Sequence, residues 1–150
     1  MTAFFVDTSA LGKRYILETG TEWLSNLIHP DSGNLVIISE LALVEIFSVF
    51  ARKQRENKLS TEALAQAQYN FLWHVKSEYQ VIFIDSPILG RARELVSKHP
   101  LRTLDAIQLA CAVEALTVLR EPIAFISADK NLLAIAAAEG FATNDPNAHA

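Results

Sequence analysis

Short apolar runs alternate along the chain with longer segments whose apolar residues recur every three or four positions. The short runs predict buried strands at 3–6, 35–38, 80–84 and 123–126, with a further short strand near 141–143. The longer segments predict helices at about 9–19, 21–28, 39–57, 61–75, 86–98, 104–119 and 129–138. From residue 144 onward no such pattern remains, and this tail is expected to fray.

Strands that alternate with amphipathic helices are typical of a parallel sheet whose connections cross over both of its faces. The predicted fold class is therefore α/β, a three-layer α/β/α sandwich around a central, mostly parallel sheet. Residues 1–150 show no repeat or interdomain linker, and their number suits a single domain with one sizeable core. In such sheets ligands gather at the carboxyl ends of the strands, so functional residues are expected there.

Composition narrows the class of protein further. Hydrophobic residues make up 51% and charged residues 20% of the chain, which excludes a disordered or collagen-like protein. The longest apolar stretch, 41–51, falls short of the roughly 20 residues of a bilayer span, so no membrane association is expected. No secretory signal is visible at the N-terminus, and the cytoplasm is the expected location. The single cysteine, Cys111, excludes an internal disulfide and a cysteine-rich zinc site.

Four acidic residues stand out against this framework. Asp7 directly follows the first predicted strand and Asp129 closely follows the fourth, so both are expected at the carboxyl edge of the sheet. The segment 41–51 is apolar on nearly every side and is expected to be buried. Glu45 is its only charge, and a carboxylate there needs a partner, a metal or a proton. Asp105 lies in the first turn of the helix predicted at 104–119.

Each acid taken singly has a simpler interpretation. Three of them can cap a helix or stabilise a first helical turn, namely Asp7, Asp105 and Asp129. For Glu45, which no cap explains, the alternative is an ion pair with a basic residue such as Arg102 or Lys13.

Together, the four acids point to a cation. Four carboxylates within about 5 Å of one another would repel by roughly 3 kcal/mol per pair at an effective dielectric of about 20. Carboxylates with room for water suit Mg²⁺ or Mn²⁺, which can polarise a phosphodiester and activate water for attack on it. The formal net charge of −4 has the wrong sign for a broad nucleic-acid-binding surface. With the four acids set aside, however, 13 acidic residues face 13 basic ones, so nucleic acid stays a possible substrate.

The segments that hold these acids resemble the four motifs of PIN-domain ribonucleases, and most closely those of the VapC toxins of toxin-antitoxin pairs. The resemblance covers nearly the whole chain in the expected order, at 6–11, 39–45, 101–110 and 125–133. It implies a PIN-like fold and an endoribonuclease that depends on Mg²⁺ or Mn²⁺. It also implies a homodimer and a small VapB-like antitoxin whose C-terminal segment occupies the active-site groove.

The resemblance also assigns roles by position. Asp7, Glu45 and Asp105 would bind the metal most directly, and Asp129 would complete the catalytic site through a second ion or ordered water. Hydroxyls beside these acids could hold a metal-bound water or a phosphate, or could simply cap helices: Thr8, Ser9 and Ser127. The two basic residues nearest the acids in sequence, Lys13 and Arg102, are the candidates for contacts with RNA phosphates.

Other functions fit less well. A phosphatase of the haloacid dehalogenase type needs a second aspartate two residues after the first, where this chain has Ser9. A receiver domain needs paired acids after the first strand, and Asp7 stands alone. A non-catalytic PIN scaffold that binds RNA or a protein partner is the remaining alternative, although no acidic position of the motifs is missing.

Overall fold

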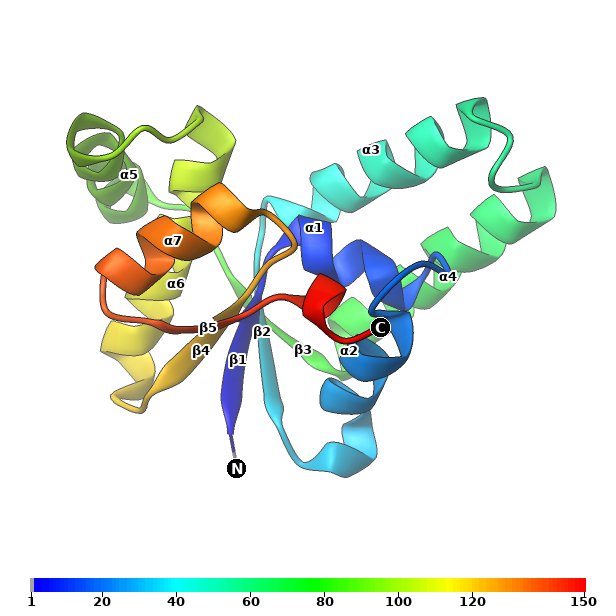
Figure 1. Cartoon of the computed structure of the whole chain (residues 1–150), viewed down its shortest axis with the longest axis horizontal. Helices are drawn as coiled ribbons and strands as arrows, with labels where there is room; N and C mark the ends of the chain where they lie inside the picture. The colour runs from blue at the N-terminus through cyan, green and yellow to red at the C-terminus, as the bar shows by residue number, and fades with distance from the viewer. Residues whose placement is uncertain (1) are drawn as a thin grey trace.

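The computed structural model describes residues 2–150, and its centre is one five-stranded sheet (Figure 1). Every neighbouring pair of strands is parallel, and the spatial order is β3-β2-β1-β4-β5. The strands are β1 (Ala3–Val6), β2 (Leu35–Ser39), β3 (Tyr79–Ile82), β4 (Ile123–Ile126) and β5 (Ala142–Asn144).

Helices cover both faces of this sheet. They are α1 (Thr8–Leu11), α2 (Thr21–Leu27), α3 (Ala42–Arg55), α4 (Thr61–Ser77), α5 (Ser86–Lys98), α6 (Thr103–Leu119) and α7 (Lys130–Ala138), with single 3₁₀ turns at η1 (Gly12–Arg14), η2 (Pro30–Ser32) and η3 (Pro146–Ala148). Figure 1 shows α5, α6 and α7 on one side of the sheet and α1 to α4 on the other, where α3 and α4 extend outward as an antiparallel pair. The three-layer α/β/α prediction is confirmed.

The alternation of side chains along β1 divides the interior into two cores. Phe5 points into the core under α5, α6 and α7, where its ring stacks on Phe125 with 5.4 Å between ring centroids. Val6 points into the opposite core under α1 to α4. A one-residue slip of β1 would turn each of these side chains to the other face of the sheet and disturb the packing of both cores. Full burial of one such side chain stabilises the fold by about 1.5–3 kcal/mol.

The order of the strands brings two distant segments together at the carboxyl edge of the sheet. After β1 the chain builds outward through β2 and β3, and only later adds β4 on the other side of β1. Val6 is in register with Ile126, and the backbone N–H of Asp7 donates to the Ile126 carbonyl at 3.0 Å. Open α/β sheets bind ligands at such a reversal of strand order, so the segments after β1 and β4 mark the expected site.

Two local predictions are wrong on the side of the sheet that α1 to α4 cover. The helix expected at 9–19 ends at Leu11 and tightens into η1, after which two successive backbone N–H groups bond to the Gly12 carbonyl. The apolar stretch at 41–51 is not buried on nearly every side, because Val44 is 72% exposed.

The tail predicted to fray is instead ordered against α2. It follows β5, which matches the short strand predicted near 141–143, and forms η3, and the His149 ring stacks flat on Trp23 with 4.1 Å between ring centroids. Gly20 has a positive φ of 87°, and a side chain there would collide with the backbone of Pro146. Within residues 2–150, no helix is long and apolar enough to cross a membrane.

Candidate metal-binding active site

A hollow of about 640 Å³ opens at the carboxyl edge of the sheet, above the ends of β1 and β4. Its lining combines carboxylates, hydroxyls, an amide, two arginines and an apolar rim: Asp7, Thr8, Ser9, Leu41, Val44, Glu45, Ser48, Val49, Arg52, Arg102, Leu104, Asp105, Gln108 and Asp129. All four acids singled out in the sequence are therefore brought to one hollow, from four separate segments. Ser127 lies beneath it, fully buried.

Asp7 is the innermost of these acids and is only 4% exposed. It follows β1 and caps α1, where its Oδ1 accepts from the Ala10 backbone N–H at 3.0 Å. Burial raises the pKa of the Asp7 carboxyl to about 6, although hydrogen bonds from Ser127, Ser9 and Ala10 act to lower it. Asp7 therefore does cap α1, as the simpler interpretation expected. Capping alone does not explain why this carboxyl group is buried and has no positively charged partner among the described residues.

Two serine hydroxyls fix the orientation of Asp7. Ser127 donates to Asp7 Oδ2 at 2.6 Å and accepts from the Asp129 backbone N–H at 3.0 Å. Ser9 donates to Asp7 Oδ1 at 2.7 Å and accepts from the Ala128 N–H at 3.0 Å. These hydroxyls connect the turn after β1 with the turn after β4, so they hold the two strand ends together as well as orienting the acid.

Glu45 is held by neutral donors. Its Oε1 accepts from the Thr8 hydroxyl at 2.8 Å and from the Gln108 amide at 2.7 Å, and the same amide lies 3.0 Å from the Thr8 hydroxyl. The alternative of an ion pair with Arg102 or Lys13 is wrong, because none of the ion pairs found in residues 2–150 involves Glu45. The carboxylate is thus positioned and its charge is left uncompensated.

Gln108 is a residue of this site that sequence reasoning missed. It is only 2% exposed and lies one turn after Asp105 on α6, so both side chains face the hollow. Its amide nitrogen donates hydrogen bonds to Thr8 and Glu45, while its Oε1 is buried without a hydrogen-bond partner among the described residues. The available signal was a lone polar residue on the buried side of an alanine-rich helix, which needs polar neighbours.

The remaining two acids lie at the outer edge of the hollow and share one cation. Arg102 donates through Nε to Asp105 Oδ2 at 2.9 Å and through an Nη to Asp129 Oδ2 at 3.1 Å. Asp129 also caps α7 through the Leu132 N–H, at 3.1 Å. Arg102 is at the N-cap position of α6 and its side chain is 78% exposed, so this bridge is surrounded by water.

Lys13, the other basic candidate, is placed differently. It is buried, and its ammonium group binds Glu18 at 3.2 Å and the Thr19 carbonyl at 2.9 Å. Lys13 does not line the acidic hollow, whereas Arg52 of α3 does. These contacts argue against the interpretation of Lys13 as an RNA contact, and they leave Arg102 and Arg52 as the two basic residues that line the hollow.

The chemistry of the donors suits a hard divalent ion. Oxygen atoms from carboxylates and hydroxyls are the ligands that Mg²⁺ and Mn²⁺ prefer. Within the described residues, the inner carboxylates, Asp7 and Glu45, form no ion pair. The outer carboxylates, Asp105 and Asp129, are bridged by the Arg102 guanidinium, which is itself a cation. Across residues 2–150, no three acidic, histidine or cysteine side chains are already drawn close enough to hold one ion. Binding of one ion by three or more of these acids would therefore require their side chains to move closer together.

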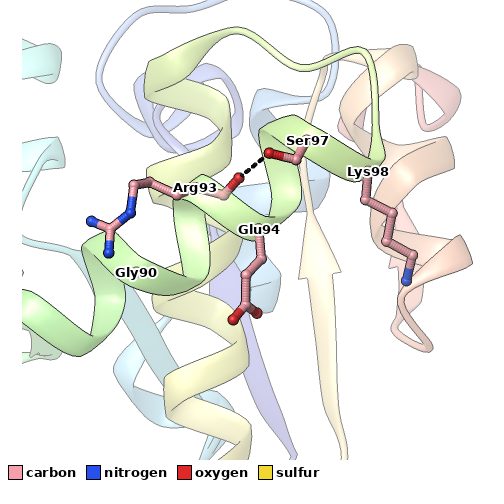
Figure 2. Close-up of a pocket in the computed structure, with 5 residues that line it drawn as sticks. All are labelled: Gly90, Arg93, Glu94, Ser97 and Lys98. Carbon is pink, nitrogen blue, oxygen red and sulfur yellow. Dashed lines mark hydrogen bonds between the residues drawn. The ribbon is translucent and has the colours of Figure 1, made fainter.

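A second hollow, of about 570 Å³, lies on the outer face of α5 and lacks these features (Figure 2). Its lining comes from one helix and holds a single carboxylate: Gly90, Arg93, Glu94, Ser97 and Lys98. The Ser97 hydroxyl is engaged with the Arg93 carbonyl at 2.9 Å, as the dashed line in Figure 2 marks. It is a depression beside a solvated helix surface.

Fold and site together define an α/β protein with a carboxylate-lined hollow at the switch point of a parallel sheet. The PIN domain family matches residues 4–138, and Ribonuclease VapC47 of Mycobacterium tuberculosis (strain CDC 1551 / Oshkosh) is 33% identical over 146 residues, 96% of this chain and 97% of that protein. The chain belongs to the PIN domain family, among its VapC-type members. This membership sets aside the haloacid dehalogenase and receiver alternatives.

Solved structures show the same fold at low sequence identity. The crystal structure of PAE2754 from Pyrobaculum aerophilum superposes with a TM-score of 0.68 at 17% identity, over 98% of this chain and 85% of that chain. The crystal structure of FitAcB from Neisseria gonorrhoeae gives a TM-score of 0.67 at 14% identity, over 95% of this chain and 97% of that chain. The arrangement of helices around the sheet is therefore shared well beyond close relatives.

Proposed function

We propose that this protein is a metal-dependent endoribonuclease and the toxin of a toxin-antitoxin pair. The observation that carries the proposal is the convergence of four carboxylates from four separate segments on one hollow. Membership of the PIN domain family and similarity to a protein named as a ribonuclease support RNA as the substrate. The proposal also includes a single domain over residues 1–150, which the one sheet shared by both cores supports. The proposed location is the cytoplasm.

The acids divide the work of holding a divalent ion. Asp7, Glu45 and Asp105 are proposed as the principal ligands, and Asp129 completes the site. When bound, Mg²⁺ or Mn²⁺ supplies Lewis acidity that polarises the phosphodiester and promotes attack by water. Ser127 and Ser9 hold the Asp7 carboxylate in place for this role.

RNA would approach across the rim of the hollow. Arg52 and Arg102 both line it, and either guanidinium can bind a phosphate oxygen. The net charge of −4 has the wrong sign for tight binding of RNA of any sequence through a broad basic surface. We therefore expect a narrow set of RNA targets, selected by the shape of the rim.

A small antitoxin is the proposed protein partner. The rim of the hollow carries exposed apolar side chains at Val44 and Leu104, beside the acidic floor. A peptide segment with apolar residues and a basic side chain matches both features. Such a segment would block access to the acids, which is the simplest route to inhibition.

The proposal also includes a homodimer. On the outer side of α5 and α6 an apolar hollow of about 280 Å³ is lined by Leu89, Ala92, Arg93, Val96, Thr103, Ala106 and Ile107. Leu89 and Val96 are partly exposed there. A second copy of the chain could bury this apolar surface, and sedimentation of the purified protein would measure the oligomeric state.

Cleavage of a mixed cellular RNA pool by the purified chain tests the proposed activity. We expect discrete fragments with Mg²⁺ or Mn²⁺, none with a chelator, and none from Asp7→Asn or Asp129→Asn. The matched control is Asp31→Asn, the same substitution at a side chain that is 94% exposed, lies in η2 and does not line the hollow, and this variant should cut normally. Full activity in both site variants would overturn the site assignment. A lack of cleavage by any form, with the antitoxin removed, would favour the non-catalytic scaffold.

A further inference from the structure

The outer edge of the acidic hollow contains a cation supplied by the protein itself. Arg102 reaches Asp105 and Asp129 with different nitrogen atoms, at 2.9 and 3.1 Å. Asp105 is on α6 and Asp129 is at the start of α7, so the guanidinium connects two elements that carry acids of the site. The two carboxylates would otherwise face each other without compensation.

This bridge is built to be reversible. The Arg102 side chain is 78% exposed, and it gives each carboxylate one hydrogen bond rather than a two-bond fork. Exposed ion pairs of this kind are weak and are screened by salt. In contrast, the oxygen atoms of Asp7 and Glu45 accept only from hydroxyl, amide and backbone donors, which cannot leave without disturbing the fold.

A divalent ion and Arg102 compete for the same two carboxylates. A monovalent guanidinium neutralises only part of the charge of four acids, whereas a divalent ion can also draw on the inner pair. Once displaced, Arg102 would lie at the rim of the hollow with its hydrogen-bond donors unoccupied. The nearest anion that a nuclease offers to such a group is a phosphate of the bound RNA.

We propose that Arg102 is the resident counter-ion of the metal-free site: it holds Asp105 and Asp129, is displaced when a divalent ion binds, and then becomes available to an RNA phosphate. Arg102 thereby couples metal loading to substrate binding. The inference rests on the proposed function, because it requires the four acids to bind a divalent cation.

Thermal melting of Arg102→Gln in a chelator and at rising Mn²⁺ concentration tests this role without measuring cleavage. The matched control is Arg52→Gln, which removes the same charge from the lining of the same hollow. Arg52 takes part in none of the ion pairs found in the described part of the chain. The control therefore reports the general effect of lowering positive charge near the acids.

Removal of the counter-ion should lower the melting temperature only when no metal is bound. In the chelator, Arg102→Gln should melt below the wild type, and saturating Mn²⁺ should close the gap. The apparent Kd for Mn²⁺ should fall roughly three- to tenfold, the range that two exposed ion pairs allow. Arg52→Gln should change the Kd by less than about twofold and should show no gap that metal closes. Arg102→Lys, which cannot span both carboxylates, should lie between wild type and Arg102→Gln.

The outcomes separate this role from the proposed function. If the wild type responds to Mn²⁺ and the two arginine variants respond alike, the counter-ion role is wrong and the metal site stands. A gap that stays constant at all metal concentrations means that Arg102 is an ordinary surface ion pair, which also overturns the inference. If neither the wild type nor any variant responds to Mn²⁺, the metal-dependent function is wrong and the counter-ion role is wrong with it.

Discussion

The acidic hollow has an inner pair, Asp7 and Glu45, and an outer pair, Asp105 and Asp129, and the two pairs are treated differently by the protein. The inner pair accepts hydrogen bonds only from uncharged groups, so its orientation is fixed while its charge remains. The outer pair shares one exposed guanidinium, so its charge is partly offset by a group that can move away. The fold therefore fixes the orientation of the inner pair, whereas the only cation bonded to the outer pair within the described residues is the exposed Arg102 side chain.

Removing the charge of the inner pair should have the largest effect. Asp7→Asn should abolish RNA cleavage and should also raise the melting temperature of the metal-free protein at pH 7. Relief of a buried, uncompensated carboxylate with a pKa near 6 is worth up to about 3 kcal/mol at that pH. Calorimetry in a chelator measures this gain, with Asp31→Asn as the exposed control.

A drop in stability would contradict the claim that Asp7 carries an uncompensated charge. It would mean that the carboxylate contributes to folding mainly as the cap of α1. Retained cleavage would exclude Asp7 from the active site whatever its effect on stability.

Loss of orientation without loss of charge should have the next largest effect. Gln108→Met keeps the volume of the side chain but removes the N–H group that serves Thr8 and Glu45. Cleavage should fall roughly ten- to hundredfold, as expected when a positioned catalytic group is loosened. Stability should change little, because the unpartnered Oε1 disappears together with the amide donor.

The control for this variant is Gln66→Met, at an exposed glutamine on α4 that bonds only to Asn70. Rates measured at saturating metal separate positioning from metal affinity. Unchanged cleavage by Gln108→Met would show that Thr8 alone is enough to orient Glu45.

The smallest expected effect is the dependence on pH of the stability difference between the wild type and Asp7→Asn. The folded chain binds the Asp7 proton more tightly than the unfolded chain, with a pKa raised from 3.8 to about 6. Between these two values the unfolded state holds fewer protons, so the contribution of Asp7 to stability falls as pH rises and is constant above about pH 6. The difference in melting temperature between wild type and Asp7→Asn should therefore grow from pH 4 to pH 6 and then level off. A constant difference would show that the pKa of Asp7 is not raised.

The fold was largely predictable because its signals are local. The short apolar run of β1 and the helical spacing of apolar residues along α5 follow from the residues of those elements alone. The errors came from contacts between distant segments. The tail is ordered by Trp23 and by the close approach of Pro146 to Gly20, which lie more than a hundred residues away in sequence.

The sequence was enough to predict the four acids that line the hollow, but not all of the groups that hold them in place. Asp7 and Asp129 follow strands, and Glu45 is a lone charge in an apolar segment, so each leaves a trace in sequence. Gln108 leaves a weak one, because its partners come from α1 and α3. Lys13 was favoured for its nearness in sequence to Asp7, yet the turn at η1 directs it to Glu18 and the interior.

The most direct test of the central claim is a crystal of the protein soaked in Mn²⁺, examined for the anomalous scattering of that ion. We expect an anomalous peak in the acidic hollow, in contact with the Asp7 carboxylate, and an Arg102 side chain that no longer bridges Asp105 and Asp129. A fully soaked crystal with no peak in the hollow, or with a peak only elsewhere, would contradict the assignment of these four acids as a metal centre.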